Sequence, residues 1–184
     1  SFKTTKNWIW QFEYNILMGH DNLQNSFPEG IYSEIGVPIS SEGLLEEVKP
    51  RFQGMNVQLK IGKIFHMTRH NKNTGFVGLL GIGLLQHRIK YVYKGELVPQ
   101  LEGEYVKGYD RLTNGLSLSQ EIGYRKYANG NKFNFQIAFE MNQGFTQNRR
   151  SWNFDEQMKD DSKRLDMYYG LKFIFLLPAY GVSN

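Results

Sequence analysis

The chain has 184 residues, enough for one domain with a full core, and a net charge of only +4. Its lysines and arginines are scattered, which does not favour nucleic-acid binding, and the lack of cysteine excludes disulfides, thiol catalysis and cysteine-based metal sites. Aromatic residues make up 15% of the chain although its mean hydropathy is -0.51, a combination typical of a transmembrane β-barrel, in which only alternate residues face lipid.

Strict alternation of apolar and polar residues predicts six strands, each of roughly the ten residues that cross a bilayer at a tilt. In chain order they lie at residues 8–19, 55–62, 75–93, 116–125, 133–142 and 165–175. The smallest usual barrel has eight strands, so we expect two more in the long segments, for example at 31–39 or 96–106. The expected fold is therefore all-β: a small antiparallel transmembrane β-barrel, with six strands evident and eight expected, that forms a single domain over residues 1–184.

The connections alternate between short and long. Residues 70–74 and 128–131 are short polar turns, whereas 20–50, 94–114 and 144–163 are long. Bacterial outer-membrane barrels have short periplasmic turns and long outer loops, so we expect periplasmic termini and three extracellular loops. Within these elements, 41–48 is a candidate short helix with Ser40 or Ser41 as its N-cap, and the blurred faces near Gln86 suggest a bulge.

The two faces of the predicted strands differ in size and charge. The apolar face carries large side chains such as Trp10, Phe12 and Phe139, too bulky for the inside of a small barrel, so we expect it to face lipid. A soluble lipocalin-like barrel with this face inward is the alternative. The other face mixes glycines with charges that nearly balance, and buried charges must be paired. We expect a plugged interior, not a pore, with a charge network of Glu13, Lys60, Glu121, Arg125, Glu140, Asp166 and Lys172.

Several segments resemble a family of small outer-membrane barrels of Bacteroidota. The resemblance is carried by GIGLLQHRIKY at 81–91, VPQLEGEYVKGYDRLTN at 98–114 and GFTQNRR at 144–150, and it continues through 153–161 and 164–180. It covers mainly residues 75–180, and its motifs lie in loops and strand ends. The resemblance implies an exported barrel that serves as an accessory subunit of an outer-membrane machine, such as the barrel-insertion (Bam) or type IX secretion apparatus.

No catalytic or metal motif has a recognisable spacing. Glu121 and Glu140 could pair as a glycosidase-like acid and base, but a buried ion network explains them better. His66, His70 and His87 lie too far apart along the strands to converge on a metal. We therefore expect no enzyme, cofactor or metal; a lipid-modifying enzyme using His20, Asp21 and Ser117 or Ser119 is an alternative, as is a soluble calycin-like carrier of an apolar ligand.

Two of the long loops combine aromatic and basic residues, which favour interfaces. We expect these loops to bind other outer-membrane proteins, through Tyr109, Asp110, Arg111, Arg149, Arg150, Trp152 and Phe154. Arg149 and Arg150 are also candidates to bind lipopolysaccharide phosphates.

Overall fold

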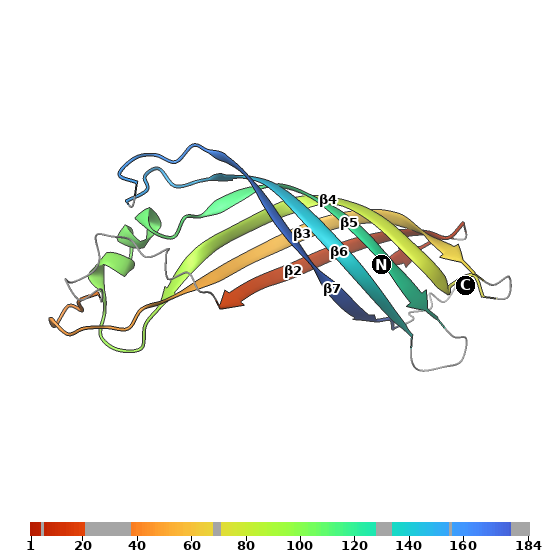
Figure 1. The fold of residues 1–184 in the computed structure, drawn as a ribbon, viewed down its shortest axis with the longest axis horizontal. Coiled ribbons are helices and arrows are strands. Elements are labelled where there is room, and N and C mark those ends of the chain that lie inside the picture. The colour runs from red at the N-terminus through yellow and green to blue at the C-terminus, as the bar shows by residue number, and fades with distance from the viewer. Residues whose placement is uncertain (5, 21–37, 68–70, 128–133, 155, 178–184) are drawn as a thin grey trace, which may run out of the picture.

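The computed structural model describes residues 1–4, 6–20, 38–67, 71–127, 134–154 and 156–177 and contains one antiparallel sheet of seven strands in chain order (Figure 1). Six strands are long, and β1 (Phe2–Lys3) is a two-residue strand at the edge of β2. The long strands are β2 (Trp8–His20), β3 (Lys49–His66), β4 (Gly75–Val92), β5 (Thr113–Lys126), β6 (Phe135–Asn148) and β7 (Lys163–Phe175). The all-β class and the six predicted strands are confirmed.

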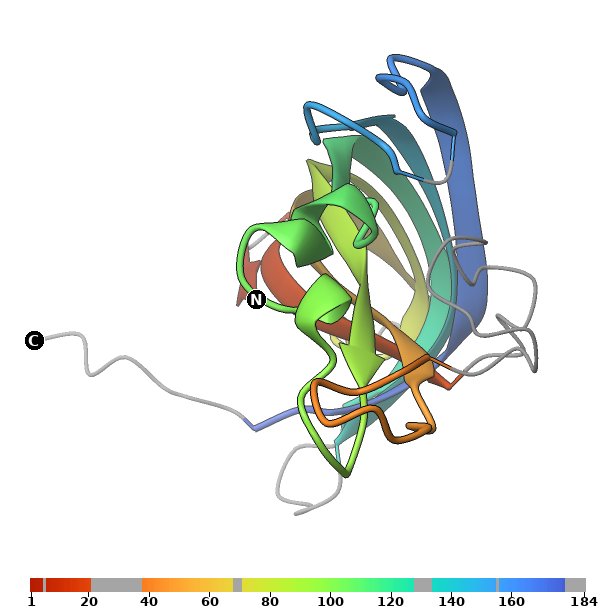
Figure 2. The same cartoon turned by 90° about the vertical axis from the view of Figure 1, so that its left-hand side faces the viewer.

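The sheet is strongly curved, and the ladder does not close between its edge strands within the described residues (Figure 2). Contacts across the concave side nevertheless join strands from opposite halves of the sheet: the Lys172 ammonium of β7 pairs with the Glu13 carboxylate of β2, and Asn56 of β3 donates to the Tyr168 hydroxyl of β7. Closure into an eight-stranded barrel stays a prediction.

Three local predictions are wrong. Residues 96–106 contain the 3-10 helix η2 (Pro99–Leu101) and the start of η3 (Tyr105–Gly108), not a strand. Residues 41–48 form no helix; instead the Ser40 hydroxyl accepts hydrogen bonds from the backbone N–H groups of Glu42 and Leu44, which closes a turn. The β3–β4 and β4–β5 registers run without a break through Gln86, so there is no bulge. The other candidate strand, 31–39, lies almost entirely outside the described residues.

The long connections gather at one end of the sheet and the short ones at the other, as the alternation predicted (Figure 1). We call these the loop end and the turn end. The N-terminus lies at the turn end (Figure 1). All three long connections therefore start and finish at the same end, where they can form one surface.

The two faces of the sheet follow the period of two. On the convex outer face the large apolar side chains are exposed, for example Phe12, Leu80 and Leu171. On the concave inner face the polar side chains are buried, for example Lys60 and Glu121. Successive side chains of a strand point to opposite faces. The alternation in the sequence therefore places the apolar side chains outside and the polar side chains inside, the reverse of a water-soluble protein.

The loops form a small structure of their own, which we call the loop cap, comprising described residues 38–48, 93–112 and 149–162. Its apolar core is shared with the loop end of β4: Val48, Val98 and Leu101 of the cap pack with Tyr91 of β4, and half-buried side chains are added by Ile89 of β4 and by Tyr93, Val106 and Tyr109. The first and second loops are also joined by backbone contacts, since Ser41 N–H donates to the Leu97 carbonyl. Figure 2, seen from the loop end, shows η2 and η3 in this position.

Candidate functional site: a filled interior and a joined loop surface

Lys60 is the centre of the inner face. Its ammonium lies 2.5 Å from a Glu13 carboxylate oxygen, 2.6 Å from one of Glu140 and 3.0 Å from one of Glu121. Lys172 contacts Glu13 and Glu140 as well and lies 3.5 Å from Glu121. Glu121 and Glu140 are direct partners in the β5–β6 register, so their carboxylates would repel each other without the two lysines.

Arg125 extends this cluster through an amide. Its Nε donates to Gln136 Oε1 at 2.8 Å, and Gln136 Nε2 donates to Glu121 Oε1 at 2.7 Å. Three carboxylates and three cations thus share one buried region. We call the set Glu13, Lys60, Glu121, Arg125, Gln136, Glu140 and Lys172 the interior charge network.

The same three carboxylates offer oxygens within 4.8 Å of one another, close enough to hold a metal ion. The Lys60 ammonium occupies the position between them and supplies the positive charge that a metal would bring. Glu121 and Glu140, which the sequence assigned to an ion network in preference to an acid–base pair, are both held in this cluster by Lys60.

A layer of hydrogen-bonded amides and hydroxyls follows toward the loop end. Gln58 donates to Asn142 at 2.5 Å, Asn56 donates to Asn142 at 3.4 Å, and Ser117 donates to Asn56 at 3.1 Å. Sequence reasoning did not single out Asn56 or Asn142, although both lie on the inner side of a predicted strand. Toward the turn end the network is instead followed by an apolar cluster of Ile9, Ile64, Val77 and Leu79.

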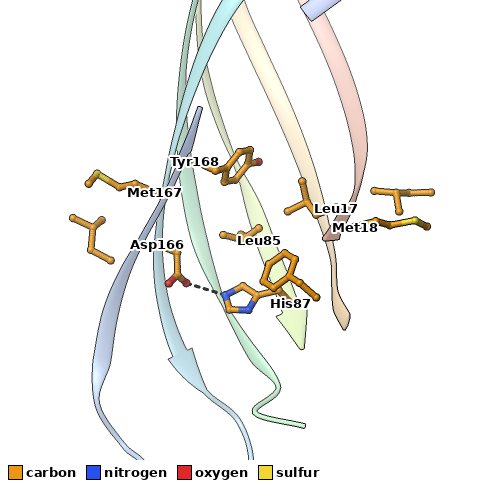
Figure 3. Close-up of a pocket in the computed structure, with 10 residues that line it drawn as sticks. Leu17, Met18, Leu85, His87, Asp166, Met167 and Tyr168 are labelled. Carbon is orange, nitrogen blue, oxygen red and sulfur yellow. Dashed lines mark hydrogen bonds and ion pairs between the residues drawn. The ribbon is translucent and has the colours of Figure 1, made fainter. Parts of the chain in front are cut away.

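Asp166 lies apart from the network that we expected it to join. Its carboxylate is 2.9 Å from His87 Nε2 and accepts a hydrogen bond from the Thr146 hydroxyl at 2.5 Å. Figure 3 shows this pair beside a cavity of about 560 Å³ between β2 and β7, which is also lined by Leu17, Leu85 and Tyr168. On β7, Tyr168 and Gly170 separate Asp166 from Lys172, so Asp166 faces the loop end of the interior.

The two histidines whose side chains the structure describes, His66 and His87, lie at opposite ends of the sheet. His66 lies at the turn end, where its Nδ1 is 3.3 Å from the Asn7 amide, whereas His87 lies at the loop end. His70, the side chain of His20, and Asp21 lie outside the described part of the chain. The Ser117 hydroxyl donates its hydrogen bond to Asn56 in the amide layer and not to His87.

The two aromatic and basic loops that the sequence singled out are joined to each other. Arg150 binds the Asp110 carboxylate with two nitrogens, one of them Nε at 2.7 Å from Oδ1, and this hydrogen bonding raises the pKa of the Arg150 guanidinium. The rings of Tyr109 and Phe154 lie 5.1 Å apart, and Phe154 N–H donates to the Gly108 carbonyl. The Arg150–Asp110 and Tyr109–Phe154 contacts hold the second loop against the third.

The other predicted partner-binding residues differ in whether they are held by contacts within the chain or exposed. Arg149 Nε donates to Asn114 Oδ1 at 2.6 Å, and its backbone N–H donates to the Leu112 carbonyl. Arg111 is in the left-handed region with φ 47° and turns the chain into β5. Trp152 is 48% exposed, and the 3-10 helix adds Tyr105 at 66%, an exposed aromatic residue that sequence reasoning missed.

Asp160 stabilises the end of the third loop that leads into β7. It is buried, and it accepts hydrogen bonds from the hydroxyl and backbone N–H of Ser162 and pairs with Arg164. Hydrogen bonds from Ser162, helped by Arg164 and Asn148, hold the pKa of the Asp160 carboxyl below its usual value. The loop is therefore tied both to its own stem and to the second loop.

Comparison with known proteins finds no matching family model, no similar curated protein and no similar solved structure. In the described part of the chain, the helices are too short and polar to cross a membrane.

Proposed function

We propose that the chain is a structural or accessory subunit of the bacterial outer membrane, with its outer face in lipid, that docks to other outer-membrane proteins through the loop cap. The interior charge network makes it a filled scaffold, not an open channel. The resemblance in its second half points to barrel-insertion or type IX secretion machinery as the partner.

The outer face carries the membrane part of this proposal. In the described strands β2–β7, no outward-facing position is Asp or Glu, and the middle of the face is aliphatic or aromatic except for Gln120 and Gln143. Outward cations occur only near the two ends: Lys49, Arg51, Arg88, Lys90 and Lys163 at the loop end, and Lys63 and Lys126 at the turn end. A face of this kind exposed to water would be an aggregation hazard, whereas lipid solvates it.

Aromatic side chains gather on the outer face near the turn end. The rings of Phe76 and Tyr124 lie 5.8 Å apart, and those of Phe135 and Phe173 lie 5.9 Å apart and are stacked. Aromatic girdles mark the interfaces of membrane barrels, because these rings are favourable at the headgroup level. This girdle supports a membrane boundary at the turn end.

The interior supports a scaffold. Along β3, inward side chains belong in turn to the apolar cluster, the charge network and the amide layer, for example Ile64, Lys60 and Asn56. Such side chains fill a narrow interior, and removing one member of a buried ion pair to open a path would leave the other charge uncompensated. We therefore expect no large stable conductance in planar bilayers; a wide open channel would contradict this.

The loop cap supplies the docking surface. It is a rigid platform because it has an apolar core, shared with β4, and the Arg150–Asp110 pair, and it exposes Trp152 and Tyr105. Preorganised aromatic side chains are the residues that most often dominate binding energy at interfaces.

Native pull-down from the host membrane in mild detergent tests the docking proposal. Trp152→Ala and Tyr105→Ala together should release a stoichiometric outer-membrane partner while the sheet stays folded and heat-modifiable on a gel. Met67→Ala, an exposed apolar residue at the turn end, is the matched control and should keep the partner. Purification of the wild-type chain alone in every preparation would refute the accessory role.

One observation favours a second candidate, a lipid-modifying enzyme: the His87–Asp166 pair faces a cavity between β2 and β7 (Figure 3). In a hydrolytic triad the nucleophilic hydroxyl is hydrogen-bonded to the histidine. Here the nearby hydroxyl, that of Thr146, donates to Asp166 and not to His87. Release of fatty acid from phospholipid vesicles by the wild type, lost in His87→Ala and kept in His66→Ala, would favour the enzyme.

A further inference from the structure

We propose that the outer face at the loop end of β3 and β4 binds a phosphorylated membrane glycolipid, with its phosphates on Arg51, Arg88 and Lys90 and an acyl chain in the groove beside them. This inference rests on the membrane placement proposed above, and it concerns a different surface from the docking loops.

The three cations form a compact cluster on neighbouring strands. Arg51 and Lys90 are direct partners in the β3–β4 register, and Arg88 is the partner of Gln53, the next outward residue after Arg51. Side chains in such positions lie about 5 to 8 Å apart, and like charges placed opposite each other are destabilising. All three side chains are exposed, and within the described residues none makes a salt bridge. An anion with several oxygens would remove their repulsion.

The neighbouring cations are already satisfied. Lys49, the next outward residue of β3, pairs with Glu47 at 2.9 Å. Arg150, a candidate phosphate ligand from the sequence, is neutralised by Asp110, and Arg149 is bonded to Asn114. The cluster of Arg51, Arg88 and Lys90 is therefore a better phosphate site than the loop arginines.

Arg88, one of the three cations, lines a groove of about 400 Å³ on the outer face. Arg88 lies at its polar side, and its apolar walls come from Tyr14, Ile16, Met18 and Met55. Gln53, also in its lining, has a buried side-chain oxygen without a hydrogen-bond partner among the described residues. A ligand that fits has an anionic group, a hydroxyl that can donate to Gln53, and an apolar chain.

These three features together select a lipid. Free phosphate has no apolar part for the groove, and a neutral lipid has no group for three cations. A phosphorylated glycolipid of the outer leaflet carries phosphates, hydroxyls and acyl chains, and the cluster lies where the outer face changes from apolar to charged. Charge-assisted hydrogen bonds from arginine to phosphate are well suited to such recognition.

The binding test uses the full chain in non-ionic detergent, with diphosphorylated lipid A as the probe and native mass spectrometry as the readout. Arg51→Gln, Arg88→Gln and Lys90→Gln together should weaken lipid A binding at least tenfold. Lys63→Gln with Lys126→Gln, which removes outward cations at the turn end, is the matched control and should bind as the wild type does. Lipid A without its phosphates should bind the wild type as weakly as the triple variant binds the intact lipid.

Two results would overturn the inference: equal binding of lipid A by the triple variant, or full competition by inorganic phosphate alone, which would indicate a free-phosphate site. Flotation of the same proteins with phosphatidylcholine vesicles separates this failure from that of the proposed function. If the wild type floats with the vesicles but shows no preference for phosphorylated lipid, only the lipid site is refuted. If the wild type stays in the aqueous fraction, the membrane placement itself is refuted, and the lipid site with it.

Discussion

Replacing Lys60 by methionine tests the interior charge network most severely. The ammonium contacts three carboxylates at 2.5, 2.6 and 3.0 Å, and its side chain is fully buried. A hydrogen bond to a charged group contributes about 1.5–3 kcal/mol to stability. Adding three such contributions would give a larger loss of unfolding free energy than is usually measured when one partner of a buried ion pair is removed. Lys172 still contacts Glu13 and Glu140 in the variant, so we expect Lys60→Met to lower the free energy of unfolding by about 3–5 kcal/mol.

Urea unfolding in detergent micelles, followed by tryptophan fluorescence, measures this loss. Lys126→Met removes an exposed lysine from the outer face at the turn end and should change stability by less than about 0.5 kcal/mol. Lys60→Met combined with Glu121→Gln removes one charge of each sign, so the double variant should be more stable than Lys60→Met alone. Wild-type stability of Lys60→Met, or no recovery in the double variant, would refute a network held by charge balance.

Three further predictions concern the outer face and the loops. Phe139→Arg should destabilise the membrane-inserted protein by about 2–4 kcal/mol if Phe139 lies near the midplane, whereas Phe135→Arg, nearer the turn end, should cost less; equal costs in a vesicle refolding assay would contradict the depth assignment. Asp160→Asn should raise the proteolysis rate of the third loop at pH 7, and the difference from the wild type should fade as the pH drops below about 4, since a carboxyl with a lowered pKa stabilises the loop only while ionised; Asp161→Asn, at an exposed position, is the control, and an equal effect would count against the Asp160 contacts. Arg150→Lys keeps the charge but loses the two-nitrogen contact with Asp110, so hydrogen exchange should speed up in both loops; unchanged exchange would show that the pair does not join them.

The strands could be predicted because the pattern is local, but their lengths could not. β3 was expected to start at Met55 and in fact starts at Lys49. The added outward residues, Arg51 and Gln53, are polar, so the alternation ends before the strand does. The strand continues because backbone hydrogen bonds to β2 and β4 hold it, and these do not depend on side-chain polarity.

The inner-face contacts show a second limit. The inward position of Lys60 and Glu140 follows from alternation, but their contact joins residues 80 positions apart on strands that are not neighbours, so it depends on the curvature of the sheet. The same holds for His87 and Asp166, which curvature brings together at the loop end. Alternation assigned Asp166 to the inner face, but it could not tell that curvature brings this residue to His87 and not to Lys60.

The loop cap could not be predicted in detail, because its turns have no period. Pro99 favours the first turn of η2. The orientation of η2, however, is set by the packing of Val98 and Leu101 on Val48 and Tyr91. The aromatic and basic composition of the loops did identify residues that lie together, namely Tyr109 with Phe154 and Asp110 with Arg150.

The most direct test of the central claim, that the outer face lies in lipid and the inner face is filled, is a spin-label scan along β6. The chain contains no cysteine, so single cysteines can be placed at successive positions from 136 to 141 without removing any native residue that would react. In reconstituted vesicles, labels at 137, 139 and 141 should collide with dissolved oxygen and be shielded from a water-soluble nickel reagent, while labels at 136, 138 and 140 should be shielded from both. Outward labels that are accessible to the nickel reagent along the whole strand would contradict the account.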